Sequence, residues 1–191
     1  MTPPFPDDPY PQLLRWLAEA APRSRAAVLA TVDGDGRPAT RAVIMGHADE
    51  RGLLFSTYTG SRKGRHLTAR PHASATYVWP GRQLTVAGTV ELLAEEEAER
   101  VFAGRPREVQ AAAAVSAQSR PLGDPEVLRR AARELVAGGA EIPRPGEWRC
   151  WRLVPYRVEF WEESPGDRIH LSLRYVRDVV GAPWRWELLQ P

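Results

Sequence analysis

The stretch GSRKGRHL, residues 60–67, concentrates positive charge at the predicted start of a helix. Arg62, Lys63, Arg65 and His66 lie within five residues, and Lys63 is the only lysine of the chain. Because the helix dipole is positive at this end, each exposed base there costs roughly 0.3–1 kcal/mol. The same bases, together with free N–H groups of the first turn, would bind a phosphate well. The cluster indicates an anion site, although a solvated helix start also fits it.

Three neighbouring features bear on this interpretation. Ser61 is a good N-cap for a helix that runs to about Ala69, and Gly64 would let a ligand approach the backbone closely. Arg41 lies in the middle of the predicted strand RPATRAVIMG, in a segment otherwise suited to burial. Because burial of an unpaired charge is expensive, Arg41 requires a partner. Either an acidic side chain or a ligand could be that partner.

Two further polar pairs occur later in the chain. In SAQSRP, Gln118 and Ser119 stand at the end of a predicted helix, where they could bond a heterocycle or a phosphate, or simply cap the helix. In RIHLSLRY, Arg168 and His170 are two residues apart, so a strand would place both on one face. That face suits an anionic or proton-exchanging ligand, and it also suits an edge strand facing water.

Several classes of site are excluded by their missing motifs. The four histidines, His47, His66, His72 and His170, show no metal-ligand spacing with acids or with Cys150. We therefore predict no metal. The chain also lacks a G-x-S-x-G elbow, a G-x-x-x-x-G-K-[ST] loop and a G-x-G-x-x-G turn.

Composition places these groups in one small domain. The 191 residues are 43% hydrophobic, which predicts a single domain over residues 1–191, with residues 1–9 as an extended Pro- and Asp-rich arm. A net charge of +2, from 26 bases and 24 acids, argues against nucleic acid as a partner. The chain has one cysteine, no signal-peptide pattern and no apolar run long enough for a bilayer. We expect a cytoplasmic protein without a membrane partner.

The elements that position the polar groups follow from apolar periodicity and turn residues. The pattern predicts about seven strands, mostly in neighbouring antiparallel pairs, with a helical insert before the last three. DGDG at 33–36 predicts a hairpin turn. Asp124, Pro125 and Gly138 predict the cap, first position and end of the clearest helix. Helices are expected at 10–21, 61–69, 94–104, 107–118 and 123–139.

Taken in order, several segments resemble the pyridoxamine 5′-phosphate oxidase family of FMN-binding split barrels. These are GRPATRAVIM, GLLFSTYTGSRKGRHL, GRPREVQAAAAVSAQS, VEFW and RIHLSLRY. The resemblance implies an α+β fold, an antiparallel and Greek-key-like split β-barrel with peripheral helices. It also implies FMN as cofactor and a homodimer with flavin sites at the interface.

The resemblance also implies which residues would hold the flavin. Arg62 and Lys63 match the bases that bind the FMN phosphate, and Arg41 with the strand after it matches the segment lining the flavin. Some contacts would come from the second subunit. The implied cofactor-binding set is Arg41, Ala42, Val43, Ile44, Ser56, Thr57, Arg62, Lys63, Gln83, Gln118, Ser119 and Trp161.

The implied substrate set departs from the family pattern. Vitamin B6 oxidases of the family grip the substrate phosphate with a lysine, a tyrosine, an arginine and a serine. The corresponding residues here are Gly46, Val101, Arg105 and Val109, so only the arginine persists. At roughly 1.5–3 kcal/mol per charge-assisted hydrogen bond, tight binding of a phosphorylated substrate would be lost.

The family's Arg-x-His pair persists as Arg168 and His170. The arginine usually found two residues later is Ser172, and Arg174 is a potential substitute. One extra residue separates Trp161 from Arg168 relative to the family.

Within the family, the chain is similar to the phenazine-biosynthesis flavin oxidases in FSTYTGS, in KGR and in the small residue at the lysine position. We therefore expect an FMN-dependent oxidase of a non-phosphorylated aromatic or heterocyclic secondary-metabolite (antibiotic-type) intermediate. Hydride would pass from the substrate to the flavin, and O2 would then reoxidise the reduced flavin to give hydrogen peroxide. Arg168, His170 and Arg105 would orient the substrate. Three alternatives stay open: a pyridoxine/pyridoxamine 5′-phosphate oxidase with an altered phosphate site, a non-catalytic flavin- or haem-binding split barrel, and a barrel without cofactor.

Overall fold

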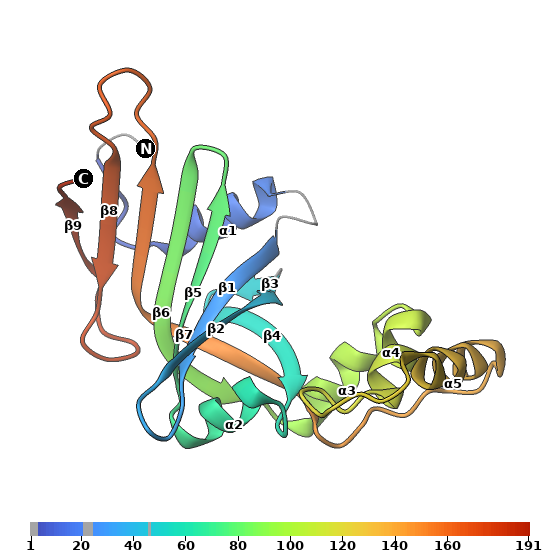
Figure 1. The fold of residues 1–191 in the computed structure, drawn as a ribbon. Coiled ribbons are helices and arrows are strands. Elements are labelled where there is room, and N and C mark those ends of the chain that lie inside the picture. Colours follow the sequence, from blue (N-terminus) through green and yellow to red (C-terminus); the bar gives the residue numbers. More distant parts are fainter. Residues whose placement is uncertain (1–3, 21–24, 46) are drawn as a thin grey trace.

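One open antiparallel sheet organises the molecule (Figure 1). The computed structural model describes residues 4–20, 25–45 and 47–191. The strand order is β2-β1-β5-β6-β7-β4-β3, and β8 and β9 extend the sheet from β7. The strands are β1 (Ala26–Val32), β2 (Pro38–Ile44), β3 (His47–Asp49), β4 (Gly52–Tyr58), β5 (His72–Trp79), β6 (Arg82–Leu92), β7 (Trp148–Glu162), β8 (Leu171–Val176) and β9 (Arg185–Leu189).

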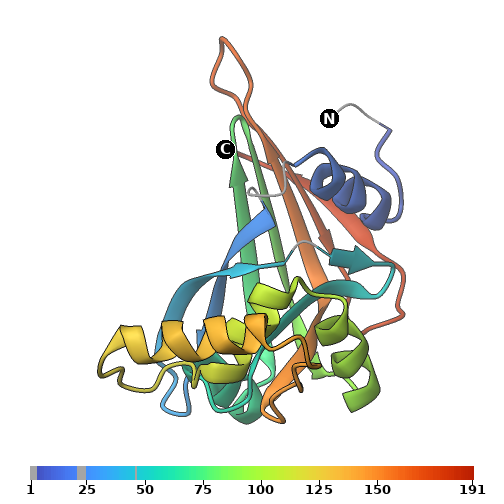
Figure 2. The same ribbon diagram turned by 90° about the vertical axis from the view of Figure 1, so that its right-hand side faces the viewer.

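Five helices surround this sheet in the described part of the chain. They are α1 (Tyr10–Glu19), α2 (Arg62–Ala69), α3 (Glu95–Ala103), α4 (Arg107–Val115) and α5 (Pro125–Ala137). Figure 2 shows α1 beside the sheet, and α3 to α5 grouped at its lower end. None of the helices in the described ranges is both long and apolar enough to cross a membrane.

The core is the inner side of the curved sheet, closed by α1. The apolar stripe of α1 buries Leu13, Trp16 and Leu17, and the Trp16 ring meets the Phe160 ring edge-on at 5.1 Å. Burial of each such side chain stabilises the fold by about 1.5–3 kcal/mol. The helix therefore fixes β7, from which β8 and β9 continue.

The first hairpin, β1–β2, has the predicted turn, and this turn fixes which residues of the two strands lie opposite each other. Val32 lies opposite Pro38, and Asp33 closes the turn by accepting the Arg37 N–H through Oδ1 at 2.8 Å. Leu29 then lies opposite Arg41. The inward-facing side chains of β1, such as Leu29, and those of β2, such as Arg41, therefore lie side by side on the same face of the sheet.

The helical region at the lower end of the sheet has its own small core. Tyr58, Phe102, Trp148 and Cys150 pack there with Ala98. Beyond it, α4 and α5 pack on each other and project away from the sheet (Figure 1). Within this chain α5 buries none of its residues.

Local capping signals predicted α5 correctly. Asp124 caps it by accepting the Glu126 N–H at 2.9 Å, Pro125 is its first residue, and Gly138 follows its last turn. The helix expected over 107–118 ends at Val115 instead.

Two strand predictions were wrong in detail. The short strand β3 was not expected; it pairs with β4 at the edge of the sheet. The strand expected from Arg168 begins only at Leu171. Arg168 lies in the preceding loop with a φ of 59°, a left-handed conformation that no strand residue adopts.

Candidate functional site: a cationic cluster and an adjacent cavity

The start of α2 is capped by side chains of its own chain. Ser61 Oγ accepts the Gly64 N–H at 3.2 Å and donates to the Tyr58 carbonyl at 2.8 Å. The Arg62 N–H donates to Ser119 Oγ at 3.2 Å. The predicted N-cap is therefore confirmed. The expectation that an anion would meet free N–H groups in the first turn was wrong for Arg62 and Gly64, because both N–H groups already donate within the chain. An anion here must be bound mainly by side chains.

Gly64 has a different role from the one expected. A Cβ at this position would lie 2.2 Å from the Tyr58 carbonyl oxygen and 2.5 Å from that of Thr59. Glycine is thus required because α2 packs directly on the end of β4, rather than because a ligand approaches. This close packing fixes the position of the bases beside it.

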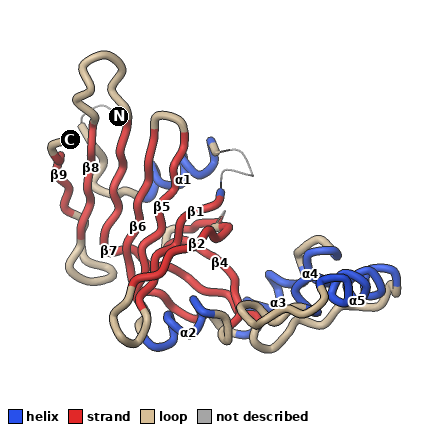
Figure 3. The backbone as a smooth tube through the Cα atoms, in the orientation of Figure 1, coloured by secondary structure: helices blue, strands red, loops and turns tan. Residues whose placement is uncertain are grey.

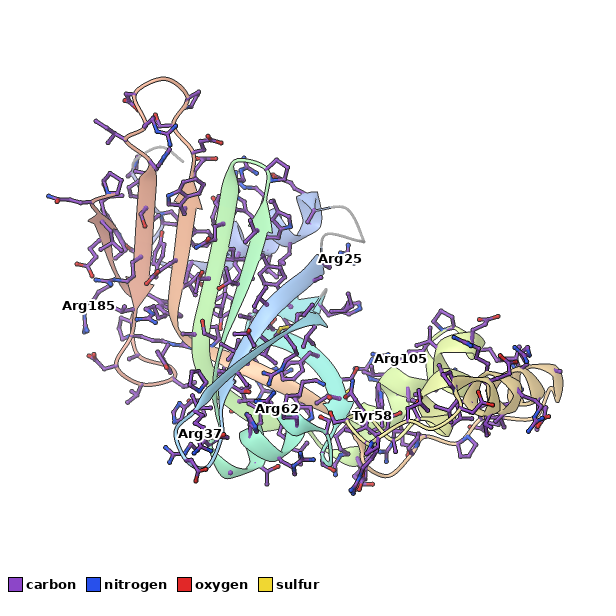
Figure 4. All side chains as sticks on the ribbon, in the orientation of Figure 1. Arg25, Arg37, Tyr58, Arg62, Arg105 and Arg185 are labelled. Carbon is purple, nitrogen blue, oxygen red and sulfur yellow. The ribbon has the colours of Figure 1, made fainter. Side chains whose placement is uncertain are left out.

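Three cations gather at this end of the sheet. Arg62 projects from α2 (Figure 4), Lys63 is buried behind it, and the Arg41 side chain reaches the same region from β2. Burial, and secondarily the charge of Arg41, lowers the pKa of Lys63 to about 8. Burial and the charge of Arg62 likewise lower the pKa of Arg41. Each cation therefore destabilises its neighbours.

No carboxylate in the described part of the chain forms an ion pair with Arg41, Arg62 or Lys63. Arg41 Nη1 instead donates to the Leu29 carbonyl at 3.1 Å and to Thr31 Oγ1 at 2.7 Å. Buried cations that lack a counter-charge are costly to hold together. The geometry therefore favours an anionic ligand over the ion-pair alternative for Arg41.

Gln118 and Ser119 complete this cluster from a turn beyond α4. Gln118 Oε1 accepts from both Lys63 Nζ and Thr57 Oγ1, each at 2.9 Å. Because ammonium groups only donate, the amide oxygen must face Lys63, and Nε2 is left to donate elsewhere. Ser119 has a φ of 71°, an uncommon conformation for a residue other than glycine. The structure thus brings six predicted cofactor residues together: Arg41, Thr57, Arg62, Lys63, Gln118 and Ser119.

A cavity of about 600 Å³ lies between β4, β7 and the start of the helical region. Its walls include all the described residues predicted to lie at a substrate phosphate: Val101, Arg105 and Val109. Ile44 and Ser56, from the predicted cofactor set, line it as well. Its volume falls within the usual range for small-molecule sites, roughly 300–1,000 Å³.

Arg105 is the cation held inside this cavity. Its Nη2 donates to Ser56 Oγ, and its guanidinium carbon lies 4.7 Å from the centre of the Trp148 ring. Burial lowers the pKa of Arg105. No ion pair with a carboxylate is formed by Arg105 within the described residues, whereas Arg100 at the rim pairs with Glu97. Arg105 therefore has donors available to a ligand.

The strand after Arg41 contributes unequally. Ala42 and Ile44 face outward, with Ile44 67% exposed, whereas the Val43 side chain is buried in the core. Only the backbone of Val43 could therefore contact a cofactor. Gly46, the predicted counterpart of the substrate-binding lysine, lies outside the described residues.

Gln83, Trp161 and His170 form a second group elsewhere. Gln83 is opposite Trp161 in the sheet, and the Trp161 and His170 rings lie 4.8 Å apart. Figure 3 shows the β5–β6 turn and the β7–β8 loop at the end of the sheet opposite α2. Since β5 separates those ends with eight residues, they lie about 25 Å apart at about 3.3 Å per residue. One chain does not bring this group to the cationic cluster.

The predicted common face of Arg168 and His170 was wrong, because neither lies in a strand. Asp167 Oδ1 organises the loop, accepting the Ser164 hydroxyl at 2.8 Å and the Ile169 N–H at 2.9 Å. His170 Nδ1 accepts the Ser164 N–H at 3.2 Å, while Arg168 is exposed.

Arg174 is also committed elsewhere. Its Nη2 and Nε donate to Glu187 Oε1 at 2.7 and 3.0 Å, an exposed ion pair that Arg174 would have to give up in order to replace the arginine missing at Ser172.

Two residues of the site were not identified from the sequence. Thr31 faces inward beside Arg41, and the 33–36 turn would have placed it there by register alone. Trp148 supports Arg105 from 43 positions away, and nothing local in the sequence signals that contact.

Comparison of the sequence with models of known protein families identifies the family of this chain. A model described as pyridoxamine 5′-phosphate oxidase matches residues 15–137, and one described as the pyridoxine 5′-phosphate oxidase C-terminal dimerisation region matches residues 148–191. The chain belongs to the pyridoxamine 5′-phosphate oxidase family. The resemblance noted from the sequence motifs is thereby confirmed, and the chain is a flavin-binding oxidoreductase that carries the dimerisation region of the family.

Relatives in this family have two kinds of name. A pyridoxine/pyridoxamine 5′-phosphate oxidase of Rhodopseudomonas palustris is 39% identical over 97% of this chain and 91% of its own. A dihydrophenazinedicarboxylate synthase of Burkholderia lata is 40% identical over 97% and 89%.

Solved structures confirm the fold. PhzG from Burkholderia lata, in complex with tetrahydrophenazine-1-carboxylic acid, matches with a TM-score of 0.91 and 40% identity over 97% of this chain and 94% of that one. A pyridoxamine 5′-phosphate oxidase-related, FMN-binding protein of Nostoc punctiforme matches over 100% of both chains at 18% identity and a TM-score of 0.75. The predicted α+β split barrel is correct, with its sheet left open.

Proposed function

We propose that the chain is an FMN-dependent oxidase of a non-phosphorylated aromatic or heterocyclic intermediate of secondary metabolism that carries a carboxylate. The observation that carries this proposal is the cavity around Arg105. Arg105 is the cation of its lining without a paired carboxylate among the described residues, since Arg100 is paired with Glu97. Val101 and Val109 present only methyl groups. One guanidinium suits a carboxylate, but a phosphate dianion would lack most of its hydrogen-bond donors.

The cationic cluster fits the phosphate of FMN. Arg41, Arg62 and Lys63 supply positive charge without a paired carboxylate among the described residues, and burial of Lys63 makes a nearby anion favourable. Gln118 Nε2 has no acceptor within the described ranges and would donate to a polar edge of the flavin. When bound, FMN would supply the hydride acceptor for a substrate C–H bond and pass the electrons to O2, giving hydrogen peroxide.

The second group of predicted residues supports a site completed by two copies of the chain. Gln83, Trp161 and His170 lie at the opposite end of the sheet from Lys63, and residues 148–191 match the dimerisation region. In a two-fold dimer, the corresponding residues of a second copy would cover the flavin and cavity of the first. Arg168 and His170 would then orient the substrate across the interface.

The relative from Burkholderia lata favours this substrate class. Its name refers to a dihydrophenazine dicarboxylate, and the matching structure holds a tetrahydrophenazine carboxylic acid. Both are phenazine-type ring systems that carry carboxylates and no phosphate. The apolar walls and the cation of the cavity suit such a molecule.

A second candidate function is oxidation of pyridoxine or pyridoxamine 5′-phosphate at an altered phosphate site. It is favoured by the relative from Rhodopseudomonas palustris, which carries that name at 39% identity. This function requires other donors to replace those absent at Val101 and Val109.

Anaerobic bleaching of the FMN-loaded protein distinguishes the two. We expect a reduced phenazine carboxylate to bleach the flavin absorbance, and admission of air to restore it with release of hydrogen peroxide. Faster bleaching by pyridoxine 5′-phosphate would instead establish the second function. Bleaching by neither would support a non-catalytic flavin carrier, against the enzymatic names of the relatives.

A further inference from the structure

A buried hydrogen-bond chain behind the cationic cluster has no role in the proposed chemistry. Thr31 is 2% exposed and His66 is 8% exposed. His66 Nδ1 lies 3.1 Å from Thr31 Oγ1, which in turn lies 2.7 Å from Arg41 Nη1. This series of hydrogen bonds thus connects α2, β1 and β2, three elements that come together only in the folded protein.

The direction of these hydrogen bonds follows from donor chemistry. A guanidinium only donates, so Thr31 Oγ1 accepts from Arg41. The buried Thr31 hydroxyl must then place its own proton on an acceptor, and His66 Nδ1 is in contact with it. His66 is therefore neutral, with its proton on Nε2. Burial first, and then the charges of Arg41 and Arg62, lower the pKa of His66, in agreement with this assignment.

The hydrogen bonds of this network also determine which donors of Arg41 remain available. Nη1 uses its two hydrogens on the Leu29 carbonyl and on Thr31 Oγ1. The Nε and Nη2 hydrogens have no acceptor among the residues that the structure describes, so they are left for a ligand. Without the Thr31 contact, the guanidinium could rotate about its last bonds and would lose free energy on ordering around an anion.

We infer that His66 is a positioning residue, which acts through Thr31 to hold the Arg41 guanidinium with its free donors toward the flavin phosphate. This inference rests on the proposed function, since it requires that the cluster bind the phosphate of FMN. It adds a specific role to two side chains that would not touch the ligand.

Two matched pairs of variants test this role. His66→Asn places an acceptor oxygen near the position of Nδ1, whereas His66→Leu provides none. Thr31→Ser keeps the hydroxyl, whereas Thr31→Val replaces it with a methyl group of similar size. The measurement is the Kd of the apo-protein for FMN and for riboflavin, which lacks the phosphate, with thermal unfolding to check folding.

We expect His66→Leu and Thr31→Val to raise the Kd for FMN about tenfold, a loss of about 1.4 kcal/mol. The Kd for riboflavin should not change, and His66→Asn and Thr31→Ser should retain the affinity of the parent protein. Wild-type affinity in His66→Leu, or equal losses in His66→Asn and His66→Leu, would overturn the inference. Should His66→Leu not fold, the Thr31 pair decides alone. A parent protein that binds FMN no better than riboflavin would overturn the phosphate site itself, and this inference with it.

Discussion

The cationic cluster at α2 and the cavity around Arg105 differ in how much charge they offer to a ligand. The cluster gathers Arg41, Arg62 and Lys63 without a paired carboxylate among the described residues. The cavity holds Arg105 among apolar walls, stacked on Trp148. Several cations suit a dianion, and one guanidinium suits a monoanion. Under the proposed function, this difference assigns a phosphate to the cluster and a carboxylate to the cavity.

The largest expected effect comes from removing the cluster. Arg62→Ala combined with Lys63→Ala should raise the Kd for FMN by a factor of about 10²–10⁴, because two charge-assisted contacts of roughly 1.5–3 kcal/mol each are lost. The Kd for riboflavin should change little, which titration by flavin fluorescence can establish. Full retention of FMN would mean that the phosphate lies elsewhere.

The second prediction concerns the cavity and removes its buried positive charge at Arg105. Arg105→Met keeps an apolar stem over Trp148 but removes the charge, so the KM for a carboxylate substrate should rise about 10–100-fold. The Kd for FMN should stay as in the parent protein. Loss of FMN would show that the two regions are not separate.

The same kinetic assay tests the predicted role of Arg168. Arg168→Ala should raise the KM for a carboxylate substrate if this side chain orients the substrate across the dimer. An unchanged KM would remove Arg168 from the site.

Affinity for FMN should also depend on pH through Lys63. Its pKa is about 8 without ligand, and a bound phosphate stabilises the ammonium and raises that pKa. Binding is therefore strongest below about pH 8 and weakens as pH rises, with a loss of about tenfold between pH 7 and 9. Lys63→Arg, which stays charged, is the matched control and should give a flat profile; a flat profile in the parent protein would contradict the assignment.

The smallest expected effect is a gain in the cavity. Val101→Tyr combined with Val109→Ser adds two hydroxyl donors and should lower the KM for pyridoxine 5′-phosphate several-fold, a gain of about 1 kcal/mol, because introduced side chains lose rotational freedom when they reach the phosphate. The control pair Val101→Phe and Val109→Ala has similar size without hydroxyls. An equal response in both pairs would show that cavity shape, rather than phosphate recognition, limits this substrate.

Features set by adjacent residues could be predicted from the sequence. Ser61, Asp124 and the 33–36 turn depend on a few neighbouring positions, and each was predicted correctly. The loop at Arg168 was not, because Asp167 offers the backbone a local hydrogen-bonding alternative to the strand. Gly64 was assigned to a ligand because its close contact with β4 exists only in three dimensions.

The site is formed by contacts between residues that are far apart in the sequence, which limits what the sequence can predict of it. Lys63 and Gln118 meet across 55 positions, and no local pattern predicts their contact. Family resemblance pointed to both residues, but not to the direction of the Gln118 amide. The substitutions at Val101 and Val109 were visible in the sequence, yet the cavity that gives them meaning requires the folded chain.

The only lysine of the chain permits the most direct test of the central claim, that the α2 cluster binds the flavin phosphate. Lysine labelled with ¹³C at Cε should give one side-chain NMR signal, from Lys63. Titration of the apo-protein with FMN should shift this signal and raise the pKa of Lys63 above its ligand-free value of about 8, whereas riboflavin should leave that pKa in place. An identical response to FMN and riboflavin, or no response to either, would contradict the account.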